Sequence, residues 1–333
     1  MGVASERVFV TDCEGPITKN DNAAELAAAF IPKGDVFFST LSLYDDYLAE
    51  VLRKPGYKAG DTLRLILPFF KAFGLDNRSV MKFSRMNIQI VPDAGDILQK
   101  IMEIAPAYIV STSYSQYIMA VCDVLGFSFL NTYSTTLNLD EYDLSSTEKV
   151  MIKDFHRRIL DLPPFSIEGA GEFGANLSPP DRETIAVLDE IFWHLMPQLG
   201  IYRLVRDVNP IGGFEKAAAI DRIVDRHGVA IRDVCYVGDS ITDVEAFRKV
   251  KAGGGLAISF NGNNWAVKEA EIAITAQTAF PIGWLADLFL TKGREALEDL
   301  LVARVFPENV DEISQISSRV RKIVRTEKIG SLG

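Results

Sequence analysis

A short apolar run near the start of the chain ends in acidic residues, and this stretch most constrains the fold. Residues 8–11 are Val-Phe-Val-Thr, and Asp12, Glu14 and Gly15 follow them. An apolar run stopped by turn residues predicts a buried strand of a parallel sheet, and active sites of open α/β sheets lie at the carboxyl ends of such strands. An acid after a strand is also common in ordinary turns that have no catalytic role. Whether Asp12 and Glu14 belong to an active site therefore depends on the rest of the sequence.

The composition is globular and does not favour polyanions. The 333 residues are 48% hydrophobic and 24% charged, which suits one large or two smaller cores. Lys and Arg total 35 against 45 Asp and Glu, which gives a net charge of −10. This charge argues against nucleic acid as a partner, but it leaves room for a local basic pocket that holds a small phosphate.

The sequence shows no pattern of export or membrane insertion. Its apolar runs are much shorter than the roughly 20 residues of a membrane helix, and residues 1–7 lack a basic segment followed by an apolar one. We therefore expect a cytoplasmic protein without a membrane span. Cys13, Cys122 and Cys235 lie far apart, so we predict neither disulfides nor a zinc site.

Helical segments interrupt a repeated strand-and-helix pattern. Asn22 followed by Glu25 is close to a capping box. Apolar residues then recur at spacings of three and four to about residue 87. Helices near 146–160 and 182–199 and a basic, solvated stretch at 319–328 are also predicted. The division that we predict is a core of residues 1–20, 88–126 and 206–275, a helical cap of 21–87, an insertion or second cap of 127–205, and a C-terminal helical extension of 276–333.

Four groups of polar residues follow predicted strands or begin a helix. In chain order they are Asp12 with Glu14, the hydroxyl cluster Ser111-Thr112-Ser113, Lys216, and Asp239 with Asp243. Hydroxyls before a helix favour either a phosphate site or an ordinary helix cap.

The acids of these groups predict a cation. Carboxylates gathered at one sheet edge repel one another unless a cation lies between them, and oxygen ligands without His or Cys favour Mg²⁺. We predict Asp12 and Asp239 as its side-chain ligands. Asp243 is either a ligand through water or an anchor for the other groups.

The order and spacing of these groups resemble the haloacid dehalogenase superfamily of phosphoryl-transfer enzymes. The resemblance covers the α/β core and implies a Rossmann-like three-layer fold with a helical cap. It implies Asp12 as the nucleophile and Glu14 as the acid and base. Ser111, Thr112 and Lys216 would then hold the phosphate.

The resemblance also implies a metal site and a branch of the superfamily. Magnesium would be held by Asp12, Asp239 and Asp243 and by the backbone carbonyl of Glu14. A helical cap directly after the first motif is similar to the phosphoserine phosphatase branch. In that branch an acid near position Asp21 contacts the substrate amino group, although Asp21 can equally cap a helix.

One residue departs from the usual motif. The family usually has Asp where this chain has Glu14, and a related phosphoserine–homoserine phosphotransferase shares the Asp-x-Glu-Gly pattern. The longer run from Asp12 to Asn22 is more similar to archaeal members of the superfamily, some of which are labelled subunit R of energy-converting hydrogenase A. We expect a magnesium-dependent phosphatase of a small phosphate monoester. A phosphotransferase to a small alcohol and a non-catalytic subunit of a larger complex stay open, as does a homodimer.

Overall fold

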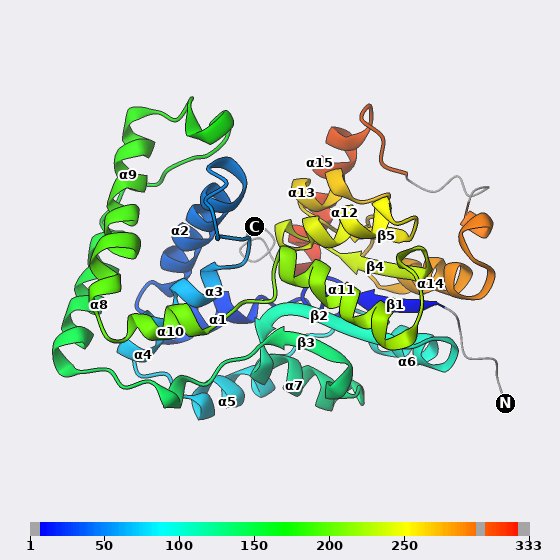
Figure 1. The fold of residues 1–333 in the computed structure, drawn as a ribbon, viewed down its shortest axis with the longest axis horizontal. Helices are drawn as coiled ribbons and strands as arrows, with labels where there is room; N and C mark the ends of the chain where they lie inside the picture. Colours follow the sequence, from blue (N-terminus) through cyan, green and yellow to red (C-terminus); the bar gives the residue numbers. More distant parts are fainter. Residues whose placement is uncertain (1–6, 298–303, 326–333) are drawn as a thin grey trace.

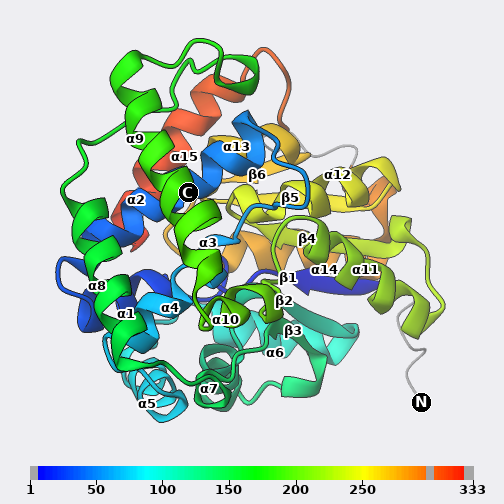
Figure 2. The same cartoon turned by 60° about the vertical axis from the view of Figure 1, so that its left-hand side comes forward.

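A six-stranded parallel sheet forms the centre of the core. The structure is a computed structural model that describes residues 7–297 and 304–325. The strand order is β3-β2-β1-β4-β5-β6 (Figures 1 and 2). The strands are β1 (Val8–Thr11), β2 (Ala107–Tyr114), β3 (Thr132–Thr135), β4 (Val234–Gly238), β5 (Leu256–Phe260) and β6 (Ile272–Ile274).

Alternate strand residues face two different helix layers. Phe9 and Ile109 belong to one hydrophobic cluster, whereas Val8, Val10 and Tyr108 belong to another. Because both sheet faces are covered, the strands are apolar along nearly their whole length. The first cluster includes residues of α6 (Ala94–Ile104), α7 (Ser115–Leu125) and α14 (Phe280–Lys292), and the second includes residues of α11 (Phe214–His227), α12 (Val244–Ala252) and α13 (Asn264–Glu269).

The cap helices and the helices of residues 146–207, which follow β3, form one helical body at one end of the molecule (Figures 1 and 2). Phe37 and Phe69 from the first segment share a continuous hydrophobic cluster with Ile152 and Phe192 from the second. The later segment therefore supports the cap by packing against it. The helices are α1 (Asn22–Phe30), α2 (Gly34–Asp46), α3 (Thr62–Leu65), α4 (Leu67–Ala72), α5 (Asn77–Asn87), α8 (Ser146–Leu160), α9 (Pro179–Asp189) and α10 (Tyr202–Asp207).

One strand ends later than predicted, and two elements of the core lie outside the residues predicted for it. β3 pairs with β2 at the sheet edge, although it lies inside the predicted insertion of residues 127–205. Its sequence, Thr-Tyr-Ser-Thr, is polar because most of the strand is only half-buried. β2 continues through the hydroxyl cluster to Tyr114. Helix α14 lies beyond residue 275 but belongs to the core cluster.

The last described helix, α15 (Val310–Arg325), packs beside α13 and buries a polar face. Its buried residues are Ser314, Ser317, Arg321 and Arg325. The prediction of a solvated basic stretch is therefore wrong for both arginines.

The cysteine and membrane predictions can also be compared with the structure. All three cysteines are buried and free. Within the ranges 7–297 and 304–325, no helix combines the length and the apolar character that crossing a membrane requires.

Candidate active site

Asp12 follows β1 at the carboxyl edge of the sheet. Its backbone N–H donates to the carbonyl of Val237 at 2.8 Å, which continues the pairing of β1 with β4. Its Oδ1 accepts the N–H of Cys13 at 2.6 Å, and its Oδ2 accepts a bond from Nζ of Lys216 at 2.6 Å. Burial raises the pKa of Asp12 to about 7, against the lowering effect of Lys216.

Lys216 reaches the site from the first turn of α11. Its side chain is fully buried, and Nζ also donates to Oδ1 of Asp243 at 2.7 Å. Burial alone would lower the pKa of Lys216, but the ion pairs with Asp12 and Asp243 raise it above the ordinary value. The ammonium group therefore stays charged and joins two buried carboxylates.

Both carboxylate oxygens of Asp243 accept bonds from this chain. Oδ1 accepts the Tyr236 hydroxyl at 2.6 Å as well as Lys216, and Oδ2 accepts the backbone N–H groups of Asp239 and Ser240 at 2.9 and 3.0 Å. Burial opposes ionisation, but these partners lower the pKa of Asp243. Of its two expected roles, the bonds support that of an anchor.

Asp239 follows β4 and lies against the loop after β1. Gly15 in that loop has φ +102°, and a Cβ there would lie 2.2 Å from Oδ2 of Asp239. Glycine therefore allows this close approach. The same oxygen accepts bonds from Nη1 of Arg321 and, at 2.8 Å, from Nη1 of Arg325.

Sequence reasoning missed these two arginines. Their spacing with Ser314 and Ser317 puts four polar residues on one face of a helix. A face of this kind can be solvated or buried against polar groups, and the charge run 319–328 made solvation the obvious choice. The spacing of Arg321 and Arg325 was the available signal.

Three acids of the site form a buried cluster. Asp12, Asp239 and Asp243 each place one carboxylate oxygen within 4.8 Å of the others. All three side chains are buried, and the donors are oxygen only. This is the donor chemistry that hard divalent cations prefer.

Glu14 connects the core to the cap. Its Oε1 accepts the backbone N–H of Asn22, the first residue of α1, at 2.6 Å. Burial and the neighbouring Asp21 raise the pKa of Glu14 well above its ordinary value, against the effect of Arg325. A carboxyl whose pKa is raised above its ordinary value is better suited to general-acid chemistry than an ordinary carboxylate.

The hydroxyl cluster lies within β2 and lines the same cavity as Asp12. Oγ of Ser111 donates to Oγ of Ser113 and accepts the Ser113 backbone N–H, both at 3.3 Å. The Thr112 hydroxyl donates to the carbonyl of Ile211 at 3.1 Å. Thr112 thus supports the segment before α11, and both Ser111 and Thr112 line the cavity.

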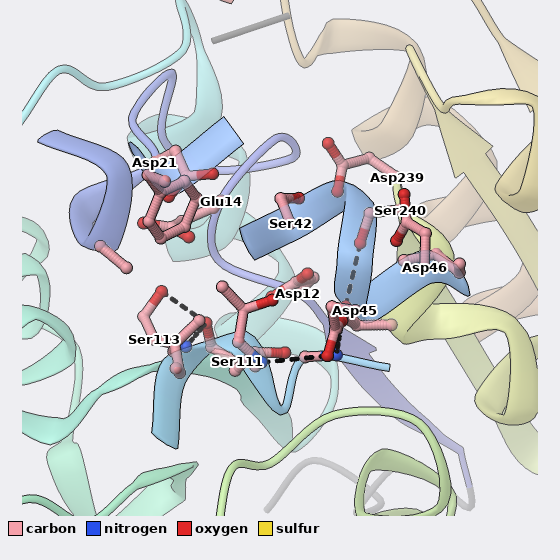
Figure 3. A pocket seen from close by; sticks show the side chains of 18 of the residues that line it. Asp12, Glu14, Asp21, Ser42, Asp45, Asp46, Ser111, Ser113, Asp239 and Ser240 are labelled. Atoms are coloured by element: carbon pink, nitrogen blue, oxygen red, sulfur yellow. Dashed lines mark hydrogen bonds between the residues drawn. The ribbon is translucent and has the colours of Figure 1, made fainter. Parts of the chain in front are cut away.

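Asp21 is the N-cap of α1. Its Oδ1 accepts the N–H of Ala24 at 3.0 Å, so the cap lies one residue before the predicted Asn22. Glu25 accepts bonds from Asn20 instead of completing a capping box. Asp21 also lines the cavity on the same side as Glu14 (Figure 3).

The cavity of about 100 Å³ lies between the sheet edge and the helical body. Figure 3 shows Ser42, Asp45 and Asp46 of the cap facing the core residues Asp12 and Asp239 across it. Asp45 is held in the cap by the Tyr57 hydroxyl at 2.6 Å and by two backbone N–H groups. A site of this size suits a small ligand.

The solved structures supply the comparison that decides the family. Gene product AF1437 from Archaeoglobus fulgidus matches with a TM-score of 0.85 and 31% identity, over 98% of this chain and 99% of that one. A substrate-bound phosphoserine phosphatase complex matches with a TM-score of 0.50 and 14% identity, over 85% and 98%. The chain belongs to the family of AF1437. No protein-family model and no curated protein matches it.

The predicted fold class, a parallel α/β sheet with helices inserted after the first strand, is confirmed. The likeness to phosphoserine phosphatase lies in the fold, in which helices follow the first strand. The similarity to an archaeal relative is confirmed along nearly the whole chain.

Proposed function

We propose that this protein is a Mg²⁺-dependent phosphohydrolase that transfers the phosphoryl group of a small phosphate monoester to Asp12 and then to water. One observation carries the proposal. Asp12 accepts a hydrogen bond from the buried Lys216, and one of its carboxylate oxygens lies within 4.8 Å of a carboxylate oxygen of Asp239 and of Asp243. Glu14 lines the same cavity.

The residues present fit a magnesium ion. Asp12 and Asp239 would hold it through carboxylate oxygens and Glu14 through its backbone carbonyl, and Asp243 would anchor the turn. The hydrogen bonds that both arginines donate to the Asp239 side chain go to its Oδ2 atom. The atoms that would hold the ion are all oxygens. When bound, the ion would neutralise charge on the phosphoryl group and favour the ionised form of Asp12.

The first half of the reaction forms a phosphoryl-aspartate. A carboxylate oxygen of Asp12 attacks phosphorus, and the bond from phosphorus to the ester oxygen breaks. Glu14 gives its proton to that oxygen, so the alcohol leaves neutral. Lys216 fixes Asp12 and offsets its charge, and Ser111 donates to a phosphoryl oxygen.

The second half regenerates the enzyme. The Glu14 carboxylate takes a proton from a water molecule, whose oxygen attacks phosphorus. The bond between phosphorus and Asp12 breaks, which releases inorganic phosphate and the free carboxylate. Splitting the transfer into two displacements lowers the barrier of each.

A small alcohol is the second candidate acceptor, because Glu14 stands where the superfamily usually has Asp. The same steps then pass the phosphoryl group to a hydroxyl oxygen. A non-catalytic role is less well supported, since the predicted nucleophile, lysine and acids all meet at one sheet edge.

The test is phosphate release from a panel of small phosphomonoesters, with Mg²⁺ and with chelator. Wild type, Asp12→Asn and Glu103→Gln, which changes an exposed acid, are compared. We expect release that needs both Mg²⁺ and Asp12 and is unchanged in Glu103→Gln. Loss of release with formation of a phosphorylated product when small alcohols are added would favour the transferase. Inactivity towards every ester and acceptor would overturn the proposal.

A further inference from the structure

The active-site cavity is lined mainly by acids. Of the described residues that line it, six are Asp or Glu and two are basic, Arg321 and Arg325. The acids are Asp12, Glu14, Asp21, Asp45, Asp46 and Asp239. A phosphate monoester carries up to two negative charges near neutral pH, so each of these acids that is ionised disfavours its entry.

Lys216 does not offset this excess. Its ammonium group lies between Asp12 and Asp243 and is balanced by them. Five of the six lining acids, all but Asp239, come from the segment after β1 and from the cap. Apart from a bound cation, the positive charge that lines the cavity comes from the two arginines.

Arg321 and Arg325 are built into the site. They are only 3% and 5% exposed, and both bond Oδ2 of Asp239. Arg321 also donates to the carbonyl of Asp239 at 3.0 Å, and Arg325 donates to the carbonyl of Lys19 at 3.1 Å. They therefore lie between β4 and the link from the core to the cap.

We propose that Arg321 and Arg325 form the anion-binding pair of this cavity, so that the C-terminal helix supplies the positive charge that a phosphate ester needs there. A buried guanidinium group keeps its charge and presents several N–H donors in one plane, which suits phosphate oxygens. The identity of the anion as a phosphate ester rests on the proposed function. The assignment of these residues rests on their burial and contacts.

The inference is tested by direct binding of inorganic phosphate and of Mn²⁺, without turnover. The variants are Arg321→Met, Arg325→Met and Arg325→Lys. The control is Arg319→Met, because Arg319 is exposed on the same helix. Calorimetry in the presence of Mg²⁺ measures phosphate binding, and electron paramagnetic resonance measures Mn²⁺ binding.

A charge role predicts opposite effects on the two ligands. We expect phosphate affinity to fall at least about 10-fold in each Met variant. It should fall clearly less in Arg325→Lys, which keeps the charge but not the planar set of donors, than in Arg325→Met, and be unchanged in Arg319→Met. Mn²⁺ should bind each Met variant at least as tightly as wild type, because Asp239 loses a competing cation.

Two results would overturn the inference. One is unchanged phosphate affinity in both Met variants. The other is an equal loss of phosphate and Mn²⁺ binding that Arg325→Lys shares, since that would show that the arginines only hold the loops in place. Failure of the proposed function looks different, because wild type itself would then release no phosphate from any ester.

Discussion

Lys216 and Asp12 are 204 residues apart in the sequence, yet Nζ of the lysine lies 2.6 Å from Oδ2 of the aspartate. The topology explains this contact. β4 pairs in parallel with β1, so the helix that precedes β4 begins at the edge where β1 ends. Lys216 lies in the first turn of that helix and Asp12 directly follows β1. The fold therefore creates the pair.

Replacing Lys216 tests how much this pair stabilises the protein. Lys216→Met leaves Asp12 and Asp243 buried without their shared cation, so we expect a loss of about 3–5 kcal/mol in the free energy of unfolding and loss of phosphate release. Lys251→Met, at an exposed position, should change stability by less than about 0.5 kcal/mol. Urea unfolding measures both. A loss below about 1 kcal/mol for Lys216→Met would contradict the structural role.

Glu14 is expected to matter most when the leaving group needs a proton. Glu14→Gln keeps a carbonyl oxygen for the N–H of Asn22 but cannot donate a carboxyl proton. We expect kcat/KM for alkyl phosphates, which reports the first half of the reaction, to fall about 10²- to 10⁴-fold. The fall should be much smaller for p-nitrophenyl phosphate, whose leaving group departs as a stable anion. Equal losses for both substrates would contradict the acid role.

Two substitutions separate the two roles of Asp21. Asp21→Ala removes the cap of α1 and should cost about 0.5–2 kcal/mol, whereas Asn is an equally good N-cap residue. If Asp21 also binds a substrate amino group, Asp21→Asn should raise KM for amino-bearing phosphomonoesters and leave the melting temperature unchanged. If Asp21→Asn changes KM equally for esters with and without an amino group, Asp21 acts only as the cap of α1.

The central part of the site could be predicted because it depends on strand ends. Asp12 and Asp239 each follow an apolar run that predicts a buried strand, and Asp243 lies in the turn four residues after Asp239. Parallel strands bring their carboxyl ends to one edge. Lys216 was predicted from the order of the motifs. Its burial and its bond to Asp243 could not be, since both depend on how α11 packs.

The remaining parts depend on contacts between distant segments. Ser317, Arg321 and Arg325 form a polar helix face, and the nearby Asp239 and backbone carbonyls offset the cost of burying it. Likewise, apolar residues such as Ile152 and Phe192 predict a hydrophobic core, but the sequence does not indicate which segment they pack against. Periodicity indicates which face is buried, whereas the tertiary fold decides against what.

The pH dependence of stability can be predicted for Glu25, which accepts two bonds from Asn20 at 2.8 and 2.9 Å. Burial raises its pKa from 4.5 to about 7, against the effect of Asn20. Between these values the folded chain binds more protons than the unfolded chain, so the contribution of Glu25 to stability falls as pH rises. Glu25→Gln does not titrate. Urea unfolding from about pH 5 to about pH 8 should therefore show wild type losing stability relative to Glu25→Gln, and a difference that stays constant with pH would contradict the raised pKa.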